Sequence, residues 1–154
     1  MPLNADQLLV VLLHSVLTKF VGEPNLAIIT LQQSEHNGNL ASIKSNLGDG
    51  ITGLMVISMK PEIFKTIHTD DFVIPTNLGP APDPVATKIT DIFKAYALES
   101  ALYTEYLTAE RISVKLALDS LSELYYKSLK NTYTGYSGVT LRQLLDHLVI
   151  NTPR

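Results

Sequence analysis

Residues 85–134 constrain this chain more than any other segment, because they contain neither glycine nor proline. Both residues interrupt helices, so a long run without them predicts helix. Just before the run, Asp83 offers an N-cap acceptor and Pro84 fits the first helical position. A single helix over the whole run would be about 75 Å long, which is too long for a compact domain. We therefore expect a break at 107–109 and a second helix that ends near Lys130.

Capping residues and apolar spacing predict helices in the rest of the chain as well. Asn4 and Gln7 have the pattern of a capping box, and so do Thr140 and Gln143. Pro24 is well placed to begin a helix because its missing N–H would be unpaired there. The expected helices outside the long run cover 4–21, 25–34, 61–67 and 140–150.

These expectations define a mainly α fold, a bundle of about five to six helices. Residues 54–59 are short and rich in apolar residues, which favours one short strand or hairpin there. Residues 71–84 carry four prolines and predict an extended crossing. We expect one helical domain over 1–154, with a division into 1–70 and 84–154, joined by the proline-rich segment, as the alternative.

Composition excludes several classes of protein. The absence of cysteine excludes disulfides, thiolate metal sites and cysteine nucleophiles. The net charge of −3 has the wrong sign for a domain that grips nucleic acid along its whole surface. Charged residues make up 18% of the chain, against about 25% in typical domains, so the surface is expected either to be polar through Ser, Thr and Asn or to be partly buried against other chains. The apolar run Leu8–Leu13 is too short for a membrane span and follows Asp6, where a signal peptide needs positive charge, so no membrane role is expected.

Titratable side chains are scattered. The four histidines are His14, His36, His68 and His147, and no two have the i, i+4 spacing that places two imidazoles on one helix face. His68 with Asp70 and Asp71 comes nearest to a metal cluster but supplies too few oxygen ligands. Asp146 and His147 are adjacent on a predicted helix and therefore face different directions. We expect no catalytic residue, no cofactor and no metal, and hence no enzyme.

Glycines at 48, 50 and 53 match the spacing of a dinucleotide-binding loop. That fingerprint requires a strand before it and a helix after it, whereas an apolar strand-like run follows here. A turn-rich loop is the expected structure of this segment.

Aromatic and basic residues gather near the carboxyl end. Tyrosines can stack on bases, although helical spacing makes packing the stronger expectation for most of them. Basic residues near the glycine-flanked tyrosines form a small cluster in the sequence. The candidate contacts for a protein interface or for RNA are Lys127, Lys130, Tyr133, Tyr136 and Arg142.

Four short motifs occur in an order that carries a family resemblance. They are Gly22-Glu-Pro24, Asn46-Leu-Gly-Asp-Gly50, Phe72-Val-Ile-Pro-Thr-Asn-Leu-Gly-Pro-Ala-Pro82, and the segment from Gly135 to Leu148. With them, the chain resembles the Gag-like polyproteins of copia-type LTR retrotransposons, in the N-terminal portion of the capsid. The chain departs from the family after Leu148, where it ends Val149-Ile-Asn-Thr-Pro-Arg154, and the RNA-binding knuckle expected downstream is not in it.

The resemblance implies a structural protein. Proteins of this kind assemble into virus-like particles around RNA in the cytoplasm, through helical capsid domains that pack side by side. We therefore expect a non-enzymatic domain that forms homo-oligomers, with RNA bound through a separate region not in this chain. The alternative is a module derived from a retroelement that binds nucleic acid or a partner protein.

Overall fold

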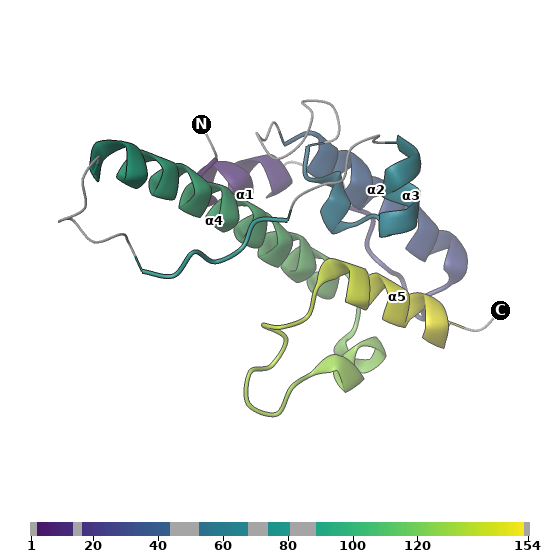
Figure 1. Cartoon of the computed structure of the whole chain (residues 1–154). Coiled ribbons are helices and arrows are strands. Elements are labelled where there is room, and N and C mark those ends of the chain that lie inside the picture. Colours follow the sequence, from purple (N-terminus) through teal and green to yellow (C-terminus); the bar gives the residue numbers. More distant parts are fainter. Residues whose placement is uncertain (1–2, 14–16, 44–52, 68–73, 81–88, 153–154) are drawn as a thin grey trace.

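The computed structural model describes residues 3–13, 17–43, 53–67, 74–80 and 89–152. These residues contain five α-helices, three single turns of 3-10 helix and one isolated β-bridge (Figure 1). The helices are α1 (Ala5–Leu13), α2 (Leu26–Ala41), α3 (Pro61–Ile67), α4 (Ile89–Asp119) and α5 (Leu141–Asn151). The 3-10 turns are η1 (Met55–Ile57), η2 (Glu123–Tyr125) and η3 (Lys127–Leu129). The predicted mainly α fold is confirmed.

The long helix α4 is the spine of the molecule (Figure 1). Helices α1 and α5 pack against it, and α2 packs against α5, α1 and η1. The core is built mainly from leucine and isoleucine, and its fully buried members include Leu8 of α1, Leu40 of α2, Ala109 of α4 and Leu145 of α5. Its members come from both 1–70 and 84–154, so the two segments share one hydrophobic core.

Both predicted capping boxes form. The backbone N–H of Asn4 donates to Gln7 Oε1 at 3.0 Å, and the backbone N–H of Gln7 donates to Asn4 Oδ1 at 2.9 Å. The same reciprocal pair joins Thr140 and Gln143 at the start of α5. Each box satisfies backbone donors that the first turn of a helix leaves unpaired.

Helix α4 corrects the predicted break at 107–109. It is continuous over 31 residues, about 46 Å at about 1.5 Å per residue, and passes through Ala109, which is fully buried. Packing against α1 along one part and against α5 along another stabilises a helix longer than the domain size suggested. The helix ends at Asp119 rather than near Lys130, and the chain continues in η2 and η3. The N-cap predicted at Asp83 lies outside the described residues.

The first two helices also differ from their predicted ranges. Helix α1 ends at Leu13. The sequence predicted that this helix continues to residue 21, but residues 17–21 are not helical. Tertiary hydrogen bonds replace helical ones there: the N–H of Thr18 donates to Glu35 Oε1 at 2.9 Å, and the N–H of Phe20 donates to the carbonyl of Ser120 at 2.8 Å. Helix α2 begins after the N-cap Asn25 and continues past the predicted end at residue 34 to Ala41. One face of α2 is buried, and this burial stabilises the helix. Gln32, His36 and Leu40, spaced four residues apart, lie on that face.

The strand predicted at 54–59 is wrong. The segment forms η1 instead, and the N–H of Leu54 donates to the carbonyl of Leu40 at 3.0 Å at the end of α2. Apolar content misled the prediction because Leu54, Ile57 and Met59 are buried by packing rather than by pairing with a strand. The turn at Gly53 needs a positive φ, here +53°, and it brings the chain against the last carbonyls of α2.

The described part of the proline-rich crossing, residues 74–80, contains no helix. It is fastened to α4 by the hydroxyl of Tyr96, which donates to the carbonyl of Gly79 at 2.6 Å. Asn77 Oδ1 accepts the N–H of Gly79 at 2.9 Å, which closes a local turn. The remaining residues of the predicted crossing lie outside the described ranges.

Candidate interaction surface

Arg142 holds α5 to two other elements. Its guanidinium donates two hydrogen bonds to Asp146 Oδ1, from Nε at 3.0 Å and from Nη2 at 2.8 Å. Nη1 donates to the carbonyl of Ser58 at 2.6 Å, and Nη2 also approaches Gln33 Oε1 at 3.5 Å. The guanidinium is thus engaged by protein acceptors, and its side chain is only 16% exposed. The charge of Arg142 is therefore used within the protein.

Glu123 brings two other predicted contacts together. The Tyr136 hydroxyl donates to Glu123 Oε1 at 3.1 Å, and the Lys130 ammonium lies 4.0 Å from the same oxygen. The ring of Tyr136 packs edge to face on the ring of Tyr126, with centroids 5.2 Å apart. Desolvation first and Glu123 second raise the pKa of Tyr136 above its ordinary value. This arrangement fixes the loop after α4 and keeps Tyr136 as a hydrogen-bond donor.

Tyr133 stands at the tip of a braced turn, which we call the Tyr133 turn (131–135). Asn131 and Gly135 exchange two backbone hydrogen bonds of 2.8 and 2.9 Å, and Asn131 Oδ1 accepts the N–H groups of Tyr133 and Thr134. The side chain of Tyr133 is 95% exposed. The turn projects from the bundle on the segment between α4 and α5 (Figure 1). Lys127 is exposed on the same segment.

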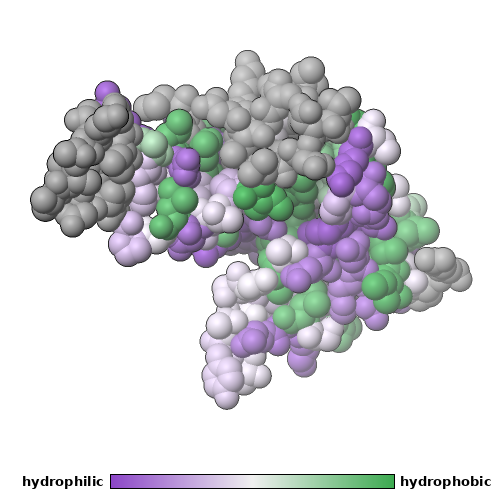
Figure 2. Space-filling view, viewed as in Figure 1, coloured by the Kyte–Doolittle hydropathy of each residue, from purple (hydrophilic) through white to green (hydrophobic). Residues whose placement is uncertain are grey.

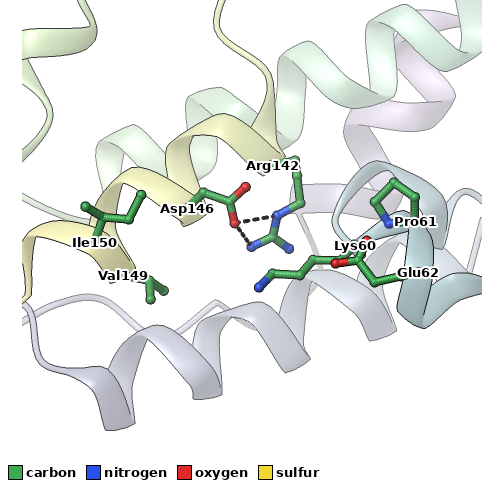
Figure 3. A pocket seen from close by; sticks show the side chains of 7 residues that line it. All are labelled: Lys60, Pro61, Glu62, Arg142, Asp146, Val149 and Ile150. Atoms are coloured by element: carbon green, nitrogen blue, oxygen red, sulfur yellow. Dashed lines mark hydrogen bonds and ion pairs between the residues drawn. The ribbon is translucent and has the colours of Figure 1, made fainter.

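A shallow groove of about 380 Å³ lies between α3 and α5 (Figure 3). Its lining residues are Lys60, Pro61, Glu62, Arg142, Asp146, Val149 and Ile150. The guanidinium of Arg142 points toward Asp146, one turn further along α5. Charges of both signs surround the small apolar floor of the groove. A groove of this composition is too mixed in charge to select a phosphate backbone.

Apolar side chains are exposed at the end of the molecule where α5 terminates. Val21 is 94% exposed, Leu124 is 74% exposed and Ile150 is 79% exposed. Their sequence neighbours Glu23, Tyr125 and Asn151 line one small hollow with Pro24, Leu148 and Thr152. Hydrophobic surface is visible beside the carboxyl end in Figure 2. We call Val21, Leu124 and Ile150 the carboxyl-end patch.

Two polar side chains on α2 are buried with one atom unpartnered. Gln32 donates to the carbonyl of Thr18 at 3.1 Å and to Ser120 Oγ at 2.8 Å, whereas its Oε1 accepts no hydrogen bond among the described residues. His36 is 3% exposed and its Nε2 also lacks a partner in the described part of the chain. Desolvation lowers the pKa of His36 to about 4, against a smaller opposing effect of Glu35. His36 is therefore neutral at physiological pH.

The other titratable candidates within the described residues do not assemble into a catalytic group. His147 approaches Ser128 Oγ at 3.3 Å and Asn151 Nδ2 at 3.2 Å, while Asp146 pairs with Arg142. In the part of the chain that the structure describes, no three His, Asp or Glu side chains lie close enough to hold a metal ion. None of the helices within the described ranges combines the length and the apolar character needed to cross a bilayer. The remaining candidates, His14, His68, Asp70, Asp71, Gly48 and Gly50, lie outside the described residues.

Sequence reasoning missed two features of this surface. The bond from Arg142 to Ser58 joins residues 84 positions apart, and no local pattern signals it. The spacing of Arg142 and Asp146, i and i+4, is a signal that could have identified their ion pair. The second missed feature is a groove beside α4 with Arg111 and Lys115 at its edge.

No protein-family model, curated protein or solved structure matches this chain, so its function is argued from its own sequence and structure.

Proposed function

We propose that this chain is a structural, non-enzymatic domain that associates with copies of itself. The observation that carries the proposal is the carboxyl-end patch, in which three aliphatic side chains are each more than 70% exposed at one end of the fold. Aliphatic side chains this exposed to water are candidate contacts for another protein chain. The low fraction of charged residues supports the same conclusion.

The resemblance to Gag-like capsid proteins of copia-type retrotransposons indicates which kind of assembly we expect. A capsid domain contributes a helical body and several contact faces rather than a reactive group. On this proposal the assembly is a virus-like particle or a smaller oligomer in the cytoplasm, and RNA is bound by a region outside this chain. The helical bundle around α4 is a suitable body for such contacts.

Sedimentation velocity over a range of protein concentration and salt, with electron microscopy of the most concentrated sample, tests the proposal. Wild type is expected to form oligomers as concentration rises. Replacing Val21, Leu124 and Ile150 by serine should shift the association to concentrations at least about tenfold higher. Serine at Ile74, Leu78 and Leu98, which are also exposed, is the matched control and should leave association unchanged. A strictly monomeric wild type at every concentration and salt would contradict self-association.

Binding of nucleic acid by the Tyr133 turn is the second candidate function. The 95% exposure of Tyr133 favours it, because an unobstructed ring can stack on a base. The engagement of Arg142 by Asp146 and the position of Lys130 beside Glu123 weaken it. A filter-binding titration with single-stranded RNA decides: this function requires binding that Tyr133→Ala reduces and that salt weakens steeply. Self-association requires neither.

A further inference from the structure

A second groove lies between α4 and the loop that leads into α5. Val114 and Leu118 of α4 form one wall, and Tyr136 and Val139 form the other. Its volume is about 370 Å³, near the lower end of the range for binding clefts. We call it the α4 groove. An apolar floor of this size accommodates a few aliphatic side chains.

Charge at the edge of the α4 groove is predominantly positive. Arg111 and Lys115 are exposed one helical turn apart, and neither forms an ion pair with a described carboxylate. Asp119, one further turn along α4, lines the other end. A segment that pairs aliphatic side chains with a carboxylate has the complementary chemistry.

Helix α1 presents such a segment. Leu8 and Leu12 are buried on its inner side, whereas Leu9 is 41% exposed and Val10 is 57% exposed. Asp6 is exposed and precedes Leu9 and Val10 by three and four residues, so the three share the outer side of the helix. It is also the only charged residue of α1. The outer side of α1 is therefore aliphatic with a single carboxylate.

We infer that the outer side of α1 of one copy docks in the α4 groove of a second copy, with Asp6 facing Lys115 and Arg111. The inference rests on the proposed self-association and names one of its contacts. In Figure 1, α1 and the loop before α5 lie on different sides of α4, so one copy does not fill its own groove. A contact between two different faces is heterologous and generates rings or open chains. With the carboxyl-end patch as a second contact, such chains can join laterally.

The size of the two faces makes this contact weak by itself. Stable interfaces bury about 800 Å² on each partner, more than one short helix and a 370 Å³ groove supply. We expect a Kd of about 10 µM to 1 mM, and a contact that depends on ionic strength because its charges lie at the rim.

Charge exchange tests the contact with the full-length chain. Asp6→Lys and Lys115→Glu should each weaken association about fivefold to tenfold at low salt, because each places like charges at the rim. An equimolar mixture of the two variants should regain association, since the introduced lysine on α1 of one copy then meets the introduced glutamate on α4 of the next. Lys94→Glu is the matched control, because Lys94 is exposed on α4 but does not line the groove, and it should associate as wild type does. Sedimentation velocity gives the readout, and thermal melting checks that each variant is folded.

Three results would overturn the inference. Either single variant could associate as tightly as wild type, the mixture could remain as dissociated as the separate variants, or Lys94→Glu could weaken association as much as Lys115→Glu does. In each case wild type still associates, so the proposed function stands while this contact falls. A wild type that remains monomeric overturns the proposed function and this inference together.

Discussion

The guanidinium of Arg142 donates a hydrogen bond to the backbone carbonyl of Ser58 at 2.6 Å. Ser58 is fully buried just after η1, and Arg142 is the second residue of α5. The bond therefore joins the carboxyl-terminal helix to a turn that itself packs on α2. Since buried carbonyl groups without a partner destabilise a fold, the position of α5 and the folding of η1 depend on each other.

Replacing Arg142 by alanine should lower the free energy of unfolding by about 2–3 kcal/mol, because hydrogen bonds to a charged group contribute about 1.5–3 kcal/mol and the Ser58 carbonyl would keep only the longer bond, 3.4 Å, from Gln33 Nε2. Urea unfolding measures the change. Arg111→Ala is the matched control, because Arg111 is exposed on α4, and it should change stability by less than about 0.5 kcal/mol. Equal effects of the two substitutions would show that the bond to Ser58 contributes little.

His36 should make the fold sensitive to acid. Its pKa is lowered from 6.5 to about 4 in the folded protein, so the unfolded chain takes up a proton at higher pH than the folded one does. The resulting stability is fully present above pH 6.5 and is lost as the pH falls toward 4, with an amplitude of about 3 kcal/mol at about 1.4 kcal/mol per pKa unit.

Urea midpoints measured between pH 4 and pH 7.5 test the role of His36. His36→Leu should flatten the pH dependence relative to wild type, whereas His147→Leu controls for the loss of an imidazole from a partly exposed position. Carboxylates titrate in all three proteins, so the difference between variants isolates the histidine. Parallel curves for wild type and His36→Leu would refute the prediction.

Among the glycines that the structure describes, Gly53 is the one where an added Cβ would be most crowded. Its φ is +53°, and a Cβ there would lie 2.7 Å from the carbonyl oxygen of Ala41 and 2.8 Å from that of Leu40. Gly53→Ala should therefore destabilise by at least about 3 kcal/mol, from backbone strain and from displacement of the end of α2. Gly22→Ala is the matched control: φ is +73° and nothing lies within 4 Å, so only the strain of about 1–2 kcal/mol remains. Thermal unfolding of both variants separates crowding from strain, and similar losses would exclude the crowding.

Local rules predicted the parts of this fold that depend on local contacts. Thr140 and Gln143 cap α5 as expected, and Pro61 begins α3 at the predicted residue. Failures occurred where distant residues decide. Residues 17–21 leave the helical conformation because Glu35 and Ser120 accept their N–H groups, and α4 continues through 107–109 because other helices pack along it. Neither partner can be read from a window of neighbouring residues.

The same limit applies to the candidate site. The sequence predicted Lys127, Lys130, Tyr133, Tyr136 and Arg142 as possible contacts for a protein or RNA, and the exposure of Tyr133 is compatible with that role. The spacing gave no sign that Arg142 would be drawn into contacts with Ser58 and Gln33. Burial and hydrogen bonding depend on which elements meet in three dimensions, and those meetings decide which charges remain available to a partner.

Glu110 provides a prediction of opposite sign, in which removing a charge stabilises the protein. The side chain is half-buried, and desolvation raises its pKa, against a smaller lowering by a hydrogen bond with the Leu141 backbone. A raised carboxyl pKa means that the folded state holds its proton more tightly, so this contribution is present at acid pH and is lost as the pH rises through the folded pKa. Glu110→Gln, which keeps a hydrogen-bond acceptor, should therefore raise the urea midpoint at pH 7 and have little effect below pH 4.

Tyr106 supplies an internal check, because burial first and the Glu110 charge second raise its pKa to about 12. In the variant, an ultraviolet titration should show Tyr106 ionising at lower pH than in wild type. A midpoint at pH 7 that falls on substitution, with the Tyr106 titration unchanged, would show that the Glu110 charge is well solvated and stabilises the start of α5 instead.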